Sequence, residues 1–267
     1  MTDYSQYSLS GCLIDESYVG PQLASLGGDD PLGTIGDGAQ QLPPKVDLRQ
    51  WCSAVEDQRS TNSCVANAVV GALELLQRKE SHSSQDLSRS FVYFNSRKLH
   101  NFEHHDKGTM VHFAMAAIIA HGICEERLWP FSEVTINDPP TEACFANAQN
   151  YRGVEFALVQ KGTPLTHVLA RGLPLVIAVK LPREAYDIAA RTGTMQLPEG
   201  GGGATHQHGN HAMAVVGYDL DQKAYLVRNS WGQGWAQGGY FWMPFAIFDA
   251  VSFDGQTWAI GSLGRAP

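Results

Sequence analysis

The stretch that decides the fold is Thr61-Asn62-Ser63-Cys64-Val65-Ala66-Asn67, in which a cysteine opens a strongly helical run. The apolar residues that follow it recur at the i, i+3, i+4, i+7 spacing of a helix with one buried face, which predicts a helix from about Asn62 to Lys79. Thr61, Asn62 or Ser63 can cap its first N–H groups. Because a helix N-terminus lowers the pKa of a thiol, Cys64 is a candidate nucleophile. A small buried hydrophobic residue is the alternative interpretation.

Three further polar residues have the spacing that catalysis by this thiol needs. Gln58 lies six residues before Cys64, His211 lies 147 residues after it, and Asn229 lies 18 residues beyond His211. A histidine can hold the thiolate as an ion pair, and an asparagine carbonyl can fix the tautomer of the ring. The Gln58 amide and the Cys64 N–H could donate to an oxyanion. Each residue alone has a structural explanation, but the four together favour catalysis.

Composition and charge exclude several classes of function. The chain of 267 residues has an ordinary hydrophobic content of 43% and a net charge of −8, which argues against a nucleic-acid or anionic-membrane partner. It contains no apolar run of the roughly 20 residues that a membrane span needs. The N-terminus lacks the pattern of a secretory signal, so we expect a cytoplasmic protein, or one exported without a cleavable signal. We expect a monomer.

Cysteine and histidine usage predicts neither a disulfide framework nor a cofactor. The five cysteines are an odd number at irregular spacing, so at least one thiol stays free, as suits a reducing compartment. His206, His208 and His211 could be read as a metal cluster. Zinc would need a rigid scaffold and further ligands, so we expect no metal there.

The periodicity predicts an α+β fold with a helical half followed by a sheet half and a cleft between two lobes. Further helices are expected at 88–100 and at 109–121, where Gly122 ends the second. Strands are expected at 175–179, 212–218, 224–227, 239–243 and 258–260, with a turn at 219–222 and a loop at 192–209 that holds four consecutive glycines. The helical lobe should span about 43–150, and the β lobe about 151–267.

Residues 1–42 differ in composition from the rest of the chain. They are rich in glycine and proline and have almost no basic residues, which predicts extended or loop-like structure. A short apolar cluster within them (Leu9, Leu13, Ile14, Tyr18 and Val19) could dock on the folded body. A disordered tail and a docked regulatory strand are both open at this point.

Three stretches together resemble the papain family of cysteine peptidases. They are 57–64 around Gln58 and Cys64, the run Asn210-His211-Ala212-Met213-Ala214-Val215-Val216-Gly217-Tyr218, and the run Arg228-Asn229-Ser230-Trp231-Gly232-Gln233-Gly234-Trp235 with its continuation to Tyr240. Weaker similarity between them extends the resemblance over about 43–250. It implies a papain-like two-lobed fold, with an antiparallel sheet or barrel in the second lobe, and hydrolysis of protein or peptide substrates.

Carried over residue by residue, the resemblance implies a role for each site residue. Cys64 would attack the peptide carbonyl, His211 would move the proton, and Asn229 would orient His211. Gln58 would complete the oxyanion hole, and Trp231 would shield the bond between His211 and Asn229 from water.

The resemblance also implies a substrate-binding edge. Gly108 would pair its backbone with the substrate strand, while Thr109 and Met110 would line the S2 pocket. Asn210 would sit near the site without being essential.

The departures from the family pattern concern the rim of the cleft. The Cys-Gly-Ser-Cys-Trp stretch of the family becomes Thr61-Asn62-Ser63-Cys64-Val65, and the Cys-x-Gly-Gly stretch becomes 105–108 with Lys107 in place of a glycine. Both changes remove disulfide halves, so the chain resembles bacterial members more than lysosomal ones. Because about forty residues cannot hold the helical propeptide of the family, residues 1–42 would be a short pro-segment or regulatory segment. An acyltransferase or deamidase with the same triad, and a non-catalytic binding module, are the rival hypotheses.

Overall fold

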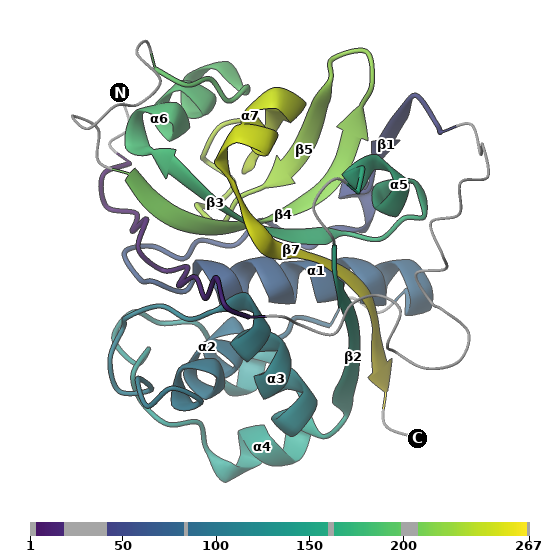
Figure 1. The fold of residues 1–267 in the computed structure, drawn as a ribbon. Helices are drawn as coiled ribbons and strands as arrows, with labels where there is room; N and C mark the ends of the chain where they lie inside the picture. Colours follow the sequence, from purple (N-terminus) through teal and green to yellow (C-terminus); the bar gives the residue numbers. More distant parts are fainter. Residues whose placement is uncertain (1–3, 19–41, 83–84, 160–162, 199–207, 266–267) are drawn as a thin grey trace.

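A computed structural model describes residues 4–18, 42–82, 85–159, 163–198 and 208–265 of the chain. It has two lobes, one of helices and one built around an antiparallel sheet, as the ribbon shows (Figure 1). Helix α1 (Cys64–Ser81) lies between the sheet and the helices α2 and α3. The α+β papain-like fold predicted from the sequence is confirmed.

The helical lobe contains the expected helices with small shifts at their ends, together with a helix at 142–148 that the sequence patterns did not indicate. Helix α2 begins one residue after Ser88, whose hydroxyl accepts a hydrogen bond from the Phe91 N–H as an N-terminal cap. Helix α3 begins at Val111 rather than at Thr109, because Thr109 pairs its backbone with the N-terminal segment. The helices of this part are α2 (Arg89–Lys98), α3 (Val111–His121), α4 (Glu142–Ala148) and the 3-10 turns η2 (Arg49–Trp51) and η3 (Glu126–Leu128).

The sheet has the order β2-β7-β3-β4-β5-β6, with β1 paired to β4, and all of its pairs are antiparallel. The expected strand at 258–260 is part of a longer strand, and three helices that the sequence patterns did not indicate pack around the sheet. The strands are β1 (Lys45–Asp47), β2 (Tyr151–Leu158), β3 (Leu175–Pro182), β4 (His208–Asp219), β5 (Ala224–Arg228), β6 (Tyr240–Pro244) and β7 (Ser252–Arg265), and the helices are α5 (Leu165–Ala170), α6 (Arg183–Thr192) and α7 (Phe245–Val251).

Two large hydrophobic clusters hold the fold together, one between α1 and the sheet and one inside the β lobe. The N-terminal segment belongs to both, since Cys12 is buried in the first cluster and Tyr7 and Leu9 in the second. Residues 4–18 therefore dock on the body rather than forming a free tail. In Figure 1 the purple N-terminal segment runs past the start of β4 and the start of α1 toward α3. The loop glycines at 200–203 lie outside the described residues.

Candidate active site

Cys64 is the first residue of α1, and its thiol is fully buried. The expected side-chain cap on the helix was wrong. Ser63 precedes the helix but makes no capping bond, because its hydroxyl accepts from the Asn67 amide and shares a hydrogen bond with the Thr61 hydroxyl. Burial raises the pKa of the Cys64 thiol to about 12, although the backbone N–H groups of Ala212, Val65 and Cys64 itself favour the thiolate.

His211 and Asn229 meet across the β4–β5 hairpin. The Nε2 atom of His211 lies 2.8 Å from the Asn229 Oδ1, which also accepts from the Ser230 N–H at 2.9 Å. Because this oxygen can only accept, the ring carries its proton on Nε2, and Nδ1 keeps a lone pair for a proton from a thiol. Nδ1 makes no hydrogen bond to the described residues.

Two further features of the surroundings affect this histidine. The Trp231 ring lies 5.4 Å from the His211 ring and is itself 2% exposed, so water does not reach the bond to Asn229. The pKa of His211 is lowered to about 4, chiefly by burial and also by the positive charge of Arg183, although the bond to Asn229 favours the charged ring. The imidazole is consequently neutral at neutral pH.

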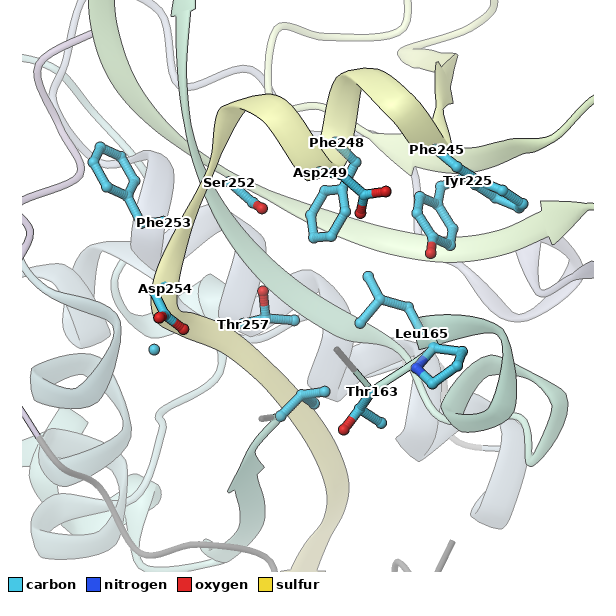
Figure 2. A pocket seen from close by; sticks show the side chains of 13 residues that line it. Thr163, Leu165, Tyr225, Phe245, Phe248, Asp249, Ser252, Phe253, Asp254 and Thr257 are labelled. Carbon is cyan, nitrogen blue, oxygen red and sulfur yellow. The ribbon is translucent and has the colours of Figure 1, made fainter. Parts of the chain in front are cut away.

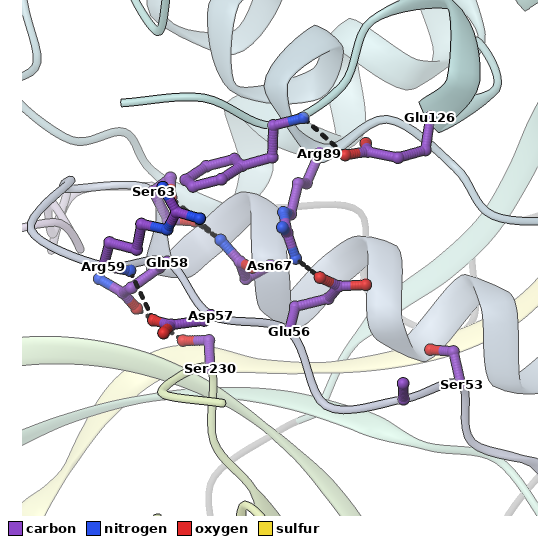
Figure 3. A network of polar contacts seen from close by, with 12 residues as sticks. Ser53, Glu56, Asp57, Gln58, Arg59, Ser63, Asn67, Arg89, Glu126 and Ser230 are labelled. Atoms are coloured by element: carbon purple, nitrogen blue, oxygen red, sulfur yellow. Dashed lines mark hydrogen bonds and ion pairs between the residues drawn. The ribbon is translucent and has the colours of Figure 1, made fainter. Parts of the chain in front are cut away.

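Gln58 is held rigidly beside the start of α1 (Figure 3). Its side-chain oxygen accepts from the Ser230 hydroxyl at 2.6 Å, and its Nε2 donates to the Thr61 carbonyl at 2.9 Å. The Gln58 backbone N–H donates to the Ser230 carbonyl at 2.8 Å. These bonds fix the amide orientation and leave one N–H of the side chain for another acceptor. Ser230, which sequence reasoning did not single out, thus connects Gln58 to Asn229.

The three residues expected at the substrate edge lie together just before α3. Gly108 has a φ of +82°, and a methyl group on it would lie 2.4 Å from the Gly11 carbonyl oxygen, so a glycine is required there. Thr109 is buried, while Met110 is partly buried. Asn210 lies on β4 opposite Lys180, one residue before His211.

The N-terminal segment occupies this edge. The Thr109 N–H donates to the Gly11 carbonyl at 3.0 Å, and the Leu13 N–H donates to the Thr109 carbonyl at 2.9 Å. Gly11 lies directly over the Cys64 thiol, because a methyl group on it would be 2.9 Å from the Cys64 Sγ and 2.4 Å from the Asn62 carbonyl oxygen. The segment therefore fills the space next to the Cys64 thiol.

Tyr7 anchors the segment on the β-lobe side of Cys64. Its ring stacks on Trp231 with a centroid distance of 4.8 Å and an interplanar angle of 6°. Its hydroxyl donates to the Trp231 carbonyl at 3.2 Å and lies 3.3 Å from an Asp57 carboxylate oxygen. Burial and the negative charge of Asp57 raise the pKa of Tyr7 to about 12.

Further contacts hold the segment at both ends. Arg183 donates to the carbonyl oxygens of Tyr4 and Tyr7, and Ser8 donates to the Asn62 side chain at 2.5 Å. At the other end, Tyr18 stacks on His112 with a centroid distance of 3.9 Å. No local pattern in the sequence indicates the roles of Tyr7 and Arg183, since their partners are 224 and 176 residues away along the chain.

A cavity of about 490 Å³ lies in the β lobe beside α7 and β7 (Figure 2). Aromatic side chains line it together with two carboxylates, Asp249 and Asp254. None of the predicted catalytic or substrate-binding residues borders it, so it is separate from the site around Cys64.

The described residues contain neither a group of three potential metal ligands nor a helix long and apolar enough to cross a membrane. Of the histidines considered above as a metal cluster, His206 lies outside the described ranges.

The family model of the papain family cysteine proteases matches residues 42–250, a range that contains all four predicted catalytic residues. The chain belongs to the papain family of cysteine proteases. Its similarity to individual members is distant in sequence.

An uncharacterized peptidase C1-like protein of Acanthamoeba polyphaga mimivirus is 28% identical over 235 residues, which cover 84% of this chain and 74% of that protein. Cathepsin K of Gallus gallus is 26% identical over 220 residues, which cover 79% of this chain and 62% of its own length. Among solved structures, the cysteine protease xylellain from Xylella fastidiosa has a TM-score of 0.77 and 25% identity, with 99% of this chain and 100% of that chain covered. The bacterial affinity expected from the missing disulfide halves agrees with the last comparison.

Proposed function

We propose that residues 43–267 form a cysteine endopeptidase in which Cys64 and His211 are the reacting pair. The observation that carries this proposal is the 2.8 Å hydrogen bond between His211 and Asn229 in the β lobe. The Cys64 thiol lies at the N-terminus of α1. With the ring proton held on Nε2, Nδ1 takes the thiol proton and the Cys64 thiolate attacks the peptide carbonyl.

The remaining steps use groups that are already in place. The side-chain N–H of Gln58 and the backbone N–H of Cys64 stabilise the oxyanion. The imidazolium then gives its proton to the leaving amine, which leaves a thioester on Cys64. Water, deprotonated by the same imidazole, hydrolyses the thioester and releases the acid.

Residues 1–42 act as a regulatory segment that restricts the cleft. Two observations support this role: Gly11 lies against the Cys64 Sγ, and burial of the site keeps the pair as neutral thiol and neutral imidazole. Removal of the segment admits water and substrate to the pair. The solvated pair can then exist as thiolate and imidazolium, the form in which the thiol is nucleophilic.

The first experiment tests the nucleophile. Cys64→Ala should abolish hydrolysis of peptide substrates and labelling by an epoxide-type thiol inhibitor. Cys52→Ala, which changes a partly buried cysteine outside the site, is the matched control and should keep both. Unchanged turnover in Cys64→Ala would refute the mechanism.

The second experiment tests the segment. The full chain is compared with a chain that starts near Gln41 and with Tyr7→Ala in the full chain. Replacement of a buried aromatic side chain by alanine destabilises a fold by about 3–5 kcal/mol. Because Tyr7 is buried by the docked segment, Tyr7→Ala should destabilise the closed state. Both variants should therefore hydrolyse peptides faster, and equal rates with equal KM in all three proteins would mean that the segment has no regulatory role.

Monomeric action in a reducing compartment completes the proposal. It is supported by five cysteines that all remain unpaired and by the net charge of −8. Light scattering after size-exclusion chromatography tests the monomer, and fractionation of cells that produce the protein tests the compartment.

A further inference from the structure

The cavity beside α7 and β7 has the size of a ligand site (Figure 2). Its volume of about 490 Å³ falls within the range of about 300–1,000 Å³ that sites for small molecules occupy in proteins. It lies apart from the residues around Cys64, so the proposed hydrolysis of peptides makes no use of it. The side chains that border it indicate which kind of molecule it would hold.

Three aromatic rings that contact one another border the cavity. The Tyr225 ring on β5 lies 4.4 Å from the Phe245 ring at an interplanar angle of 45°, and 5.4 Å from the Phe248 ring at 80°. Phe245 and Phe248 are three residues apart on α7, so they lie on the same side of that helix. Tilted and edge-on contacts of this kind hold each ring in place. Aromatic rings at a binding site attract cations and contact the apolar part of a ligand.

The Tyr225 hydroxyl is a polar group that lacks a partner in this cavity. The Tyr225 side chain is only 6% exposed, and its hydroxyl makes no hydrogen bond to any of the described residues. Figure 2 shows the hydroxyl directed into the cavity, toward the side that Leu165 lines. A buried polar group without a hydrogen bond costs about 1–3 kcal/mol, and a ligand with a polar group at this position would supply the missing bond.

The charged groups around this hydroxyl are negative. Asp249 follows Phe248 on α7, and Asp254 on β7 borders the same cavity. Of the described residues that border the cavity, none is a lysine, an arginine or a histidine. The pKa of Tyr225 is raised, chiefly by burial and also by the negative charge of Asp249. The cavity therefore favours a cation over a neutral or an anionic ligand.

We propose that this cavity binds a small organic cation, namely a primary amine or a guanidine on an apolar body. The charged group lies beside the Asp249 carboxylate and donates an N–H to the Tyr225 hydroxyl, while the apolar body contacts Phe245 and Phe248. Ammonium and guanidinium groups only donate hydrogen bonds, and both the carboxylate and the hydroxyl oxygen can accept them. The site does not depend on the reactivity of Cys64, so it stands or falls separately from the proposed function.

The test compares the binding of 2-phenylethylamine and of the neutral 2-phenylethanol to the full chain, by NMR titration of the ring protons of each ligand at about 0.15 M salt. We expect saturable binding of the amine, with a Kd at least about tenfold lower than that of the alcohol. Tyr225→Phe removes the hydroxyl and keeps the ring, and it should raise the Kd of the amine by about twofold to tenfold. Asp249→Asn should raise it by about fivefold. Asp221→Asn removes an exposed carboxylate from the turn between β4 and β5, outside the cavity, and should leave the Kd within about twofold of its original value.

Three results would overturn the proposal. The first is no saturable binding of the amine at concentrations up to about 10 mM. The second is equal affinity for the amine and the alcohol, which would mean an apolar pocket without preference for a cation. The third is an equal loss of affinity in Asp221→Asn and Asp249→Asn, which would mean general attraction to a chain with a net charge of −8. The comparison of the two ligands uses the unmodified chain, so it holds even if a variant fails to fold.

Discussion

Substitution of Gly11 by alanine is the smallest change that should open the cleft. The added methyl group would lie 2.4 Å from the Asn62 carbonyl oxygen and 2.9 Å from the Cys64 Sγ. The first of these atoms is backbone at the start of α1, so the segment rather than the body must move. The closed state loses stability, while the open state, in which residue 11 is in water, does not.

The stability that the closed state loses in Gly11→Ala can be estimated from the packing around residue 11. An extra methyl group in a tightly packed site costs about 1–3 kcal/mol. Alanine also lowers the conformational entropy of the released segment relative to glycine, which stabilises the closed state by about 0.4–1 kcal/mol. The net loss of stability of the closed state is centred on about 1.3 kcal/mol, which raises the open fraction by roughly tenfold.

The assay measures kcat/KM for a peptide substrate and the second-order rate of inactivation by an epoxide inhibitor. Both should rise by the same factor, because each depends on the open fraction. Gly234→Ala is the matched control, since a methyl group there meets nothing within 4 Å, and its rates should stay within about twofold of the unmodified chain. Unchanged or slower rates in Gly11→Ala would mean that the contact at Gly11 does not keep the cleft closed.

Three other predictions follow from the same contacts. Arg183→Met removes two hydrogen bonds to the Tyr4 and Tyr7 carbonyl oxygens and should raise the inhibitor-labelling rate several-fold, with no change if these bonds do not hold the segment. Asn229→Ala removes a buried bond to the ring that becomes charged, worth about 1.5–3 kcal/mol, and should lower kcat/KM by about tenfold to a hundredfold; full activity would exclude an orienting role. In Cys64→Ala, the pKa of His211 is about 4 in the closed form and returns toward its usual value of 6.5 when the segment opens, so opening takes up a proton between these two pH values. Limited proteolysis of the segment should therefore accelerate as the pH falls from 6.5 to about 4. NMR titration of His211 should give a pKa near 4 for the closed form.

The arrangement of Gln58, His211 and Asn229 could be predicted from the sequence because these residues lie in short local patterns. The helical periodicity after Cys64 and the run from Arg228 to Tyr240 each fix a local structure, and the turn at 219–222 joins the strands of His211 and Asn229. The structure brings His211 and Asn229 together as the spacing predicts and holds Gln58 beside the start of α1.

Other features could not be predicted, because they depend on contacts between distant parts of the chain. Tyr7 stacks on Trp231, which lies 224 residues away along the chain, and the glycine-rich segment has no periodicity that would indicate this partner. The start of α3 shifts from Thr109 to Val111 because the segment pairs with Thr109. Ser63 looked like a helix cap, but the Asn67 side chain and the Thr61 hydroxyl compete for its oxygen.

The rate of Cys64 alkylation by iodoacetamide as a function of pH, measured by mass spectrometry in the full chain and in Tyr7→Ala, tests the ion pair and its control by the segment most directly. We expect slow alkylation in the full chain, where burial raises the pKa of Cys64 to about 12. In Tyr7→Ala we expect fast alkylation that persists to about pH 5, because an imidazolium at His211 keeps the thiolate. Equal rates in both proteins, each rising with a single pKa near about 8.5 as for an ordinary thiol, would contradict both the ion pair and its control by the N-terminal segment.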